Sequence, residues 1–359
     1  MNIVIRTDAS LEIGTGHVMR CVTLAKQLER EGANITFICR NFPGNSISFI
    51  QGQGFHVHPL VSYENQKHWQ WMRRNWKRDA AETKLVIKEL GGKVDLLIVD
   101  HYGIDTQWES ELRSATAHIM VIDDLANRSH DCDLLLDQNY YLSMQKRYKG
   151  LVSDSCIQLL GPNYVLLREE FLSINIQKIK RDGKVNNILV FFGGTDPTEE
   201  TMKTLKAIEE LAHSAIEINV VVGIGNPQKE MIEQVCSKMP NALFRCQVNN
   251  MAELMVNADL AIGAGGTTSW ERCYLGLPTI VIVVADNQKE VTNAIEENGA
   301  ILCLGESAVV TESIISKAIH DLCNKPVKVK EMVQNCWEIV DPKVARSQLV
   351  IKNVMRLLK

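Results

Sequence analysis

The chain has 359 residues, of which 45% are apolar and 23% are charged. These values are typical of a soluble globular protein, and the length predicts two domains. The formal net charge is −4, so no strong positive field holds a polyanion and we expect no nucleic-acid partner. The 10 cysteines form no C-x-x-C pair, which argues against a zinc framework or a compact disulfide scaffold.

The N-terminal segment reaches Arg6 after a short apolar run, which does not fit a signal peptide. The longest apolar stretch, residues 280–285, is far too short to cross a bilayer. We therefore expect a cytoplasmic protein without a membrane partner, with most of its cysteines as buried free thiols.

Strand-like and helix-like segments alternate along the first half. Residues 2–6 are β-branched, and residues 17–31 carry apolar residues on one helical face up to Gly32. The next expected strands are residues 33–39, 95–100, 118–122 and 133–136. Their apolar runs lack polar alternation, which predicts strands buried on both faces of a parallel sheet.

The same pattern restarts in the second half after a polar segment, residues 168–186, that suits a linker. The expected strands are residues 187–192, 217–222, 242–244, 260–262, 278–284 and 300–302, and residues 342–359 look helical. We predict an α/β fold of two doubly wound Rossmann-like domains, 1–167 and 168–359, facing a cleft. In such sheets ligands bind beyond the carboxyl ends of the strands.

The first expected strand leads into a loop with Gly14, Gly16 and His17. Two glycines permit a tight turn and a close approach to a ligand. A dinucleotide fingerprint fails because the third glycine is replaced by Met19. His17 has two interpretations, a catalytic base or a helix-start histidine that bonds a nearby carbonyl.

Two further glycine loops follow strands of the second half. Gly193 and Gly194 precede a helix in which Pro197 suits the first turn, although a plain strand–turn–helix connection explains them equally well. The stronger signal is a diphosphate cradle of backbone amides and hydroxyls before another helix. It consists of Gly265, Gly266, Thr267, Thr268 and Ser269. Glu271 would accept hydrogen bonds from a ribose, or would act only as a helix-dipole partner.

Other candidates carry less weight. Residues 100–103 end a strand and suit a site. The pair Asp123 and Asp124 also ends a strand but is not expected to bind metal, and neither are His56 and His58, which lack a third ligand. Residues 69–78 mix tryptophans with basic residues and favour an amphipathic surface helix over a platform for single-stranded nucleic acid.

Six motifs together resemble one enzyme family. They are residues 6–8, residues 13–17 with Arg20, and residues 99–103, 121–124, 192–196 and 265–271. The sequence resembles the UDP-2,4-diacetamido-2,4,6-trideoxy-β-L-altropyranose hydrolases of pseudaminic acid biosynthesis over nearly its whole length. Spore-coat polysaccharide proteins carry similar motifs. The family is related to the UDP-GlcNAc transferase of peptidoglycan synthesis and shares its GT-B architecture.

The resemblance implies hydrolysis of a UDP-linked sugar to UDP and free sugar, with inversion at the anomeric carbon and without metal or cofactor. His17 would be the catalytic base. The other site residues would bind the substrate, and we expect a monomer that acts in flagellin glycosylation or polysaccharide biosynthesis. Those substrate-binding residues are Gly14, Gly16, Arg20, Tyr102, Gly194, Gly265, Gly266, Thr267, Thr268, Glu271 and Asn287.

The chemistry of the residues agrees with this reading. A glycosyl diphosphate already has a good leaving group, so one base for water and donors for the diphosphate suffice. The main alternative is a GT-B glycosyltransferase that uses the same UDP site with an acceptor. A non-catalytic UDP-sugar sensor would not need His17. A nicotinamide oxidoreductase is disfavoured by the missing third glycine.

Overall fold

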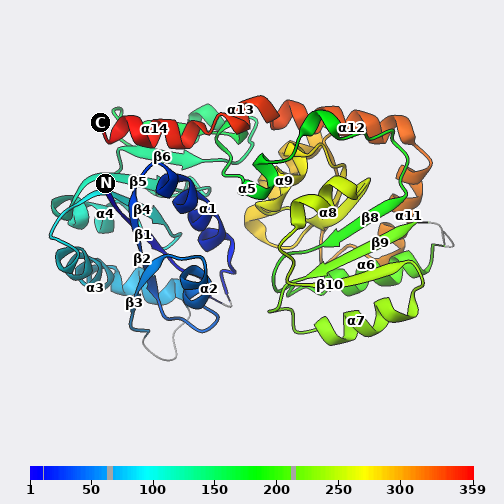
Figure 1. The fold of residues 1–359 in the computed structure, drawn as a ribbon, viewed down its shortest axis with the longest axis horizontal. Helices are drawn as coiled ribbons and strands as arrows, with labels where there is room; N and C mark the ends of the chain where they lie inside the picture. The colour runs from blue at the N-terminus through cyan, green and yellow to red at the C-terminus, as the bar shows by residue number, and fades with distance from the viewer. Residues whose placement is uncertain (11, 63–67, 212–215) are drawn as a thin grey trace. The chain divides into compact units, whose positions relative to one another are not determined.

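The structure is a computed structural model that describes residues 1–359 apart from 11, 63–67 and 212–215. The chain forms two compact units. Unit 1 comprises residues 1–139, 143–166 and 348–359, and unit 2 comprises residues 140–142 and 167–347. Each unit is a parallel β-sheet with helices on its faces (Figure 1).

Unit 1 contains a seven-stranded sheet in the order β3-β2-β1-β4-β5-β6-β7. Every pair of neighbours is parallel, and Ile3 of β1 lies opposite Ile35 on one side and Leu96 on the other. Separate apolar cores cover the two faces, so the central strands are buried on both sides. The strands are β1 (Asn2–Thr7), β2 (Asn34–Arg40), β3 (His56–Leu60), β4 (Val94–Asp100), β5 (Thr116–Ile122), β6 (Leu134–Asp137) and β7 (Ile157–Leu160).

The helices of unit 1 pack their apolar residues against these cores. Helix α3 contains residues 69–78, as expected for that segment, and has a non-helical residue at Asn75. Trp71 is buried in it beneath the guanidinium of Arg40, 4.1 Å from the ring centroid. The helices are α1 (Gly16–Arg30), α2 (Ile47–Gly52), α3 (His68–Glu89), α4 (Thr106–Leu112) and α14 (Leu349–Leu357), with one-turn helices η1 (Arg113–Ala115), η2 (Met144–Lys146) and η3 (Pro162–Tyr164).

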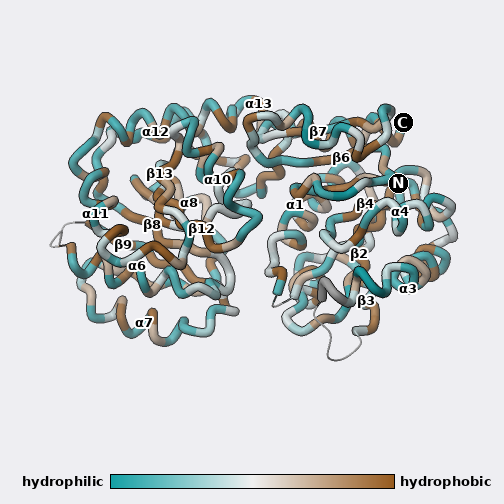
Figure 2. The backbone as a smooth tube through the Cα atoms, turned by 180° about the vertical axis from the view of Figure 1, so that it is seen from behind, coloured by the Kyte–Doolittle hydropathy of each residue, from teal (hydrophilic) through white to brown (hydrophobic). Residues whose placement is uncertain are grey.

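Unit 2 contains a six-stranded parallel sheet in the order β10-β9-β8-β11-β12-β13. Figure 2 shows its inner strands, β9 and β12 among them, as hydrophobic, and their residues form one continuous apolar core. The strands are β8 (Asn187–Phe191), β9 (Glu217–Val222), β10 (Ala242–Cys246), β11 (Leu260–Ala264), β12 (Thr279–Val283) and β13 (Ile301–Glu306).

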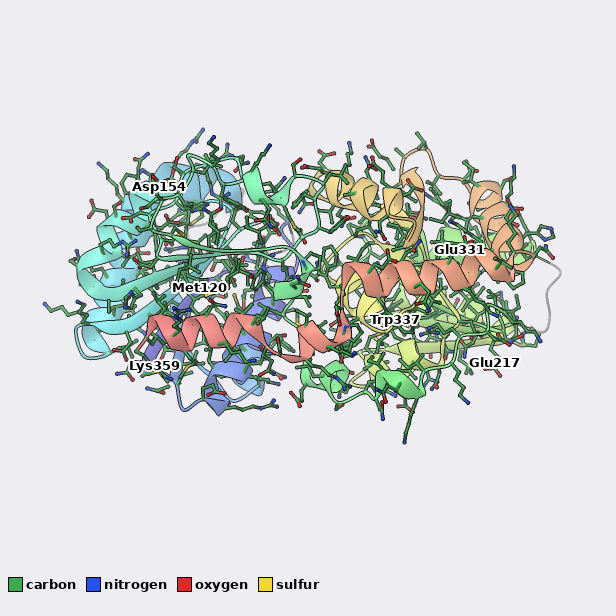
Figure 3. The ribbon with its side chains drawn as sticks, turned by 90° about the horizontal axis from the view of Figure 1, so that it is seen from above. Met120, Asp154, Glu217, Glu331, Trp337 and Lys359 are labelled. Atoms are coloured by element: carbon green, nitrogen blue, oxygen red, sulfur yellow. The ribbon has the colours of Figure 1, made fainter. Side chains whose placement is uncertain are left out.

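Nine helices surround this sheet among the described residues, with one-turn helices η4 (Ile176–Lys178) and η5 (Asp286–Gln288). Trp337, which Figure 3 labels on α12, donates its indole N–H to the carbonyl of Tyr274 over 3.2 Å and so fastens α12 to the end of α9. The helices are α5 (Glu169–Leu172), α6 (Glu200–Glu209), α7 (Lys229–Lys238), α8 (Met251–Asn257), α9 (Thr268–Tyr274), α10 (Lys289–Glu297), α11 (Glu312–Cys323), α12 (Pro326–Ile339) and α13 (Pro342–Arg346).

Three expectations need correction. The C-terminal stretch was expected with residues 168–359, but residues 348–359 belong to unit 1 because Val350, Ile351 and Val354 of α14 are buried in its core. Strands β3 and β7 were not expected. The helix after β8 begins at Glu200, beyond Pro197, because the carboxylate of Asp196 accepts the amides of Glu200 and Thr201.

The strand order of each sheet reverses at one point, and at such a point the loops beyond the carboxyl ends diverge and leave room for a ligand. In unit 1 this point lies between β1 and β4, and in unit 2 between β8 and β11. The glycine loops at Gly14, Gly194 and Gly265 all follow one of these strands. None of the helices in the described part of the chain is both long and apolar enough to cross a membrane.

Candidate functional site

The carboxyl edge of the unit 1 sheet carries a row of buried aspartates. They end or directly follow neighbouring strands, from β1 through β4 and β5 to β6. Each forms an ion pair with an arginine, as a buried carboxylate requires. The pairs are Asp8 with Arg6 (2.7 Å), Asp100 with Arg20 (2.6 Å), Asp123 with Arg128 (2.8 Å) and Asp137 with Arg147 (3.3 Å).

His17 meets this row at the point where the strand order reverses. Its Nδ1 lies 2.5 Å from Oδ1 of Asp100, and its ring is 6% exposed. Arg20, one helical turn further along α1, donates from Nε to Oδ2 (2.6 Å) and from Nη2 to Oδ1 (2.7 Å) of the same carboxylate. A carboxylate held in this way accepts the Nδ1 proton of His17 and leaves Nε2 as the basic nitrogen.

The Asp100 carboxylate is fixed in its ionised form. Burial by itself would raise its pKa, but Arg20 and His17 outweigh that effect and hold the pKa well below its usual value. The thiol of Cys21 adds a weak donor, with Sγ 3.4 Å from Oδ2. Asp100 is the most important residue that the sequence reasoning did not assign, although residues 100–103 had been marked as a strand end.

Tyr102 lies against His17, with ring centroids 4.3 Å apart and planes at 82°. Burial, followed by the charge of Asp124, raises the pKa of Tyr102 well above its usual value, so its hydroxyl stays protonated. The third guanidinium nitrogen of Arg20, Nη1, donates to Asp124 over 2.8 Å. Arg20 therefore joins two strand ends as well as positioning Asp100.

A pocket of about 410 Å³ opens beside Tyr102 within unit 1. Arg128 lines it but is committed to Asp123 and to the carbonyl of Ile104. Arg73 of α3 contributes an exposed cation. The lining consists of Arg73, Tyr102, Gly103, Asp105, Leu125, Asn127 and Arg128.

The loop that presents His17 depends on a left-handed turn at Gly14, whose φ is 70°. The Gly14 amide donates to the carbonyl of Ser10 over 2.9 Å and closes the turn. Gly16 is the first residue of α1. Both glycines therefore shape the loop, whereas Arg20 and Tyr102 touch His17 or its carboxylate directly.

The corresponding edge of unit 2 is rich in glycine instead of aspartate. Gly194 follows β8, and the loop after β9 packs directly onto it. A Cβ on Gly223 would lie 2.3 Å from the carbonyl oxygen of Gly194, so only glycine fits there. The backbones of these two loops therefore lie in direct contact.

The loop after β11 contains the residues that were predicted to form the diphosphate cradle. Gly265, Gly266 and Thr268 are half-buried and Thr267 is exposed at the start of α9, so the segment is open to a ligand. A Cβ on Gly265 would lie 2.3 Å from the hydroxyl oxygen of Thr292 in α10, which excludes other residues.

Glu271 lies in the first turn of α9, but both of its carboxylate oxygens are already engaged. Arg168 donates from Nε to Oε1 (2.7 Å) and from Nη2 to Oε2 (3.1 Å), while its Nη1 pairs with Glu170 at 2.7 Å. Burial raises the pKa of Glu271 despite Arg168. Neither the ribose nor the helix-dipole interpretation had anticipated Arg168, which is 103 positions away in the sequence.

Asn287 lies in η5, the one-turn helix after β12. Its neighbour Gln288 is the residue nearer to the cradle. Gln288 accepts the Val284 amide through Oε1 (3.1 Å), and its Nε2 lies 4.0 Å from where a Cβ on Gly266 would stand. Its amide group can therefore donate towards this loop, whereas the resemblance had implied substrate binding by Asn287.

Metal ligation finds no support at the weaker candidates. Within the described residues, no three histidine, cysteine or acidic side chains form a group that could hold a metal ion. His56 and His58 lie on the edge strand β3. Asp123 is instead bonded by Arg128 and by the hydroxyl of Tyr148 at 3.0 Å.

Comparisons with known proteins place these features in context. Residues 188–349 match the Glycosyltransferase family 28 C-terminal domain. The chain is 26% identical to the spore coat polysaccharide biosynthesis protein SpsG of Bacillus subtilis, over 92% of this chain and 91% of that one. It is also 26% identical to the UDP-2,4-diacetamido-2,4,6-trideoxy-β-L-altropyranose hydrolase of Campylobacter jejuni, over 83% and 97%.

A 26% identical protein of Methanocaldococcus jannaschii matches 81% of this chain, which spans only 57% of that protein's length. Among solved structures, MurG of Acinetobacter baumannii superposes with a TM-score of 0.70 and 14% identity over 99% of both chains. The expected resemblance and fold class are thus confirmed: the chain is a GT-B-like protein of two parallel α/β units, similar in sequence to the altropyranose hydrolase and to SpsG, with a match to the family 28 C-terminal domain in its second half.

Proposed function

We propose that this protein hydrolyses a UDP-linked diacetamido-trideoxy sugar, in the manner of UDP-2,4-diacetamido-2,4,6-trideoxy-β-L-altrose hydrolysis, to UDP and free sugar. The observation that carries the proposal is the histidine whose Nδ1 faces a buried, arginine-clamped carboxylate at 2.5 Å. This arrangement gives a neutral imidazole one defined basic nitrogen, as the activation of water requires. The sequence similarity to the Campylobacter hydrolase supports the choice of substrate.

The two units have separate tasks in this proposal. Unit 1 supplies His17 as the base, with Arg20 and Asp100 positioning it, and Tyr102 and the adjacent pocket hold the sugar. In unit 2 the Gly265–Gly266 cradle, with Thr267 and Thr268, binds the diphosphate, Glu271 binds the ribose, and Gly194, Asn287 and Gln288 complete the donor set. Attack of water opposite the leaving UDP inverts the anomeric carbon, and backbone amides stabilise the leaving group without a divalent metal.

Glycosyl transfer is the alternative, and the family 28 match and the MurG-like fold favour it. An acceptor requirement separates the two reactions. The purified protein is incubated with a panel of UDP-diacetamido sugars in EDTA, with and without sugar or lipid acceptors, and UDP release is measured. We expect acceptor-independent turnover of one panel member. A strict acceptor requirement would establish the transferase, and loss of turnover on chelation with rescue by magnesium would refute leaving-group stabilisation by amides.

A further inference from the structure

A buried cation lies at the base of the Gly265 loop. Arg272 of α9 is 3% exposed, and its Nη2 donates to the carbonyl of Ala264 (2.7 Å) and to the hydroxyl of Ser269 (2.9 Å). These two partners stand immediately before and after residues 265–268. The guanidinium therefore joins the two ends of the loop and lies beneath its amides.

The guanidinium of Arg272 forms no ion pair with a carboxylate within the described residues, although the charge of Glu271, which Arg168 already pairs, also favours its protonated form. Its hydrogen bonds go to a carbonyl and a hydroxyl, and its buried Nε has no partner there. Burial lowers its pKa to about 10, so it stays charged at neutral pH. A buried charge without a direct ion pair is costly, and that cost falls when an anion binds nearby.

A second buried polar group, a threonine hydroxyl with unused hydrogen-bonding capacity, lies behind the same loop. The hydroxyl of Thr292 is buried, has no hydrogen-bond partner among the described residues, and occupies the space next to Gly265. Gly263 lies against the guanidinium itself, because a Cβ on this residue would lie 2.5 Å from Nη1 of Arg272. The base of the loop thus holds a buried guanidinium whose hydrogen-bond acceptors are neutral groups, with a buried hydroxyl beside it that has no partner among the described residues.

We propose that Arg272 supplies the electrostatic attraction that makes this loop select a diphosphate, acting through space from beneath the amides that contact the ligand. This inference rests on the proposed function, since it assumes that UDP binds at residues 265–268. It makes Arg272 a positioning and charge-providing residue. When a single positive charge lies near a bound anion in the partly screened interior of a protein, it raises the affinity for that anion about tenfold or more.

The chain offers a matched control in Arg181. This arginine is half-buried, desolvation lowers its pKa to about 10, and its guanidinium donates to the carbonyls of Met255 and Ala258. Its Nε lacks a partner among the described residues too. Ala258 precedes β11, whereas the Gly265 loop follows β11. Arg181 therefore shares the chemistry of Arg272 but lies at the opposite end of the strand.

The test compares UDP with uridine, which lacks the phosphates, by calorimetry. We expect Arg272→Gln to lower the UDP-to-uridine affinity ratio about tenfold, with Arg272→Lys restoring most of it. Arg181→Gln should lower the unfolding temperature but leave the ratio unchanged. Equal losses for UDP and uridine in Arg272→Gln would mean a purely structural role and overturn the inference. A wild-type protein with no preference for UDP over uridine would overturn the proposed function as well.

If Arg272→Gln does not fold, Arg272→Lys gives an independent measurement. Burial lowers the pKa of a lysine far more readily than it discharges an arginine. The UDP-to-uridine ratio of Arg272→Lys should therefore fall as the pH rises from about 7 to about 10, because the lysine loses its charge, while the wild-type ratio stays higher at the upper end. Identical pH profiles in the two proteins would overturn the inference.

Discussion

The carboxyl edge of the unit 1 sheet carries four buried aspartates, each paired with an arginine, whereas the same edge of the unit 2 sheet carries glycine loops and a buried arginine that forms no ion pair among the described residues. Paired aspartates and arginines hold their side chains in place, but because their charges neutralise one another they do not attract an ion. A lone buried cation beneath open backbone amides favours an anionic ligand. The difference suggests that unit 1 is built to orient a proton acceptor and unit 2 to hold a phosphate.

The largest effect should come from removing the base. His17→Asn keeps a polar side chain of similar reach but no basic nitrogen, so kcat should fall by about 10²–10⁴. UDP affinity should stay near the wild-type value, because the nucleotide is assigned to the other unit. Single-turnover rates and UDP calorimetry check the two halves of this prediction. Near wild-type turnover in the variant would mean that another residue is the base.

Asp100→Asn tests whether the carboxylate orients His17. Loss of the acceptor for the Nδ1 proton removes the preference for a basic Nε2, and kcat should fall by about 10–10³ with little change in KM. Asp124→Asn is the variant to compare, because Asp124 bonds Arg20 through Nη1, whereas Asp100 bonds both Arg20 and Nδ1 of His17. Equal effects of the two substitutions would show that Arg20 alone positions the site.

A smaller effect is expected at the nucleotide site. Glu271→Ala should weaken UDP binding by about 1.5–3 kcal/mol, the range for hydrogen bonds to a charged group. Glu170→Gln is the matched control, because Glu170 bonds the same Arg168 at 2.7 Å from outside the cradle. Calorimetry should give nearly unchanged affinity for this control. If both variants bind UDP like the wild type, Glu271 serves only to hold Arg168.

The smallest expected effect is on the pH dependence of stability, and it comes from Asp137, the last aspartate of the row. Burial, and next the charge of Asp124, raise the pKa of Asp137 to about 7, whereas an unfolded aspartate titrates near about 3.9. The folded state therefore holds a proton that the unfolded state has lost, and stability decreases as the pH rises from about 4 to about 7.

Asp137→Asn mimics the protonated form and should remove that decrease. Between pH 5 and pH 8, the wild type should lose about 1–3 kcal/mol of unfolding free energy relative to the variant. Urea titrations of both proteins at the two pH values measure the difference. Parallel pH dependences would show that Asp137 stays ionised. The attraction of Arg147 would then lower the pKa of Asp137 by more than burial raises it.

The inner strands of both sheets and the edge strands of unit 2, β10 and β13, could be predicted from the sequence, whereas the edge strands of unit 1 could not. Strands β4 and β12 read as unbroken apolar runs because both of their faces are buried. The two edge strands of unit 1 lack that signature: β3 contains His56 and a proline, and in β7 Ile157 and Gln158 are exposed. Edge positions are half solvated, so their composition resembles that of loops.

The site shows a similar division. Glycine loops after strands indicated where His17 and Gly265 lie, because a tight turn or a close backbone contact requires glycine at that very position of the sequence. The partners that define their chemistry come from distant segments: Asp100 is 83 positions from His17, and Arg168 is 103 from Glu271. Such pairings depend on strand order and not on spacing. The C-terminal helix was predicted as a helix, but its place in unit 1 was missed for the same reason, since its apolar face packs into a core formed by the first half of the chain.

Hydrolysis at carbon by a water that His17 activates is the central claim, and turnover in heavy-oxygen water tests it most directly. With no acceptor present, the label should appear on the anomeric hydroxyl of the released sugar, in equal amount to the UDP formed, and early NMR spectra should show the inverted anomer. His17→Asn should slow the incorporation of label into the sugar in step with kcat. Label on the terminal phosphate of UDP would place the attack at phosphorus and contradict the role assigned to His17.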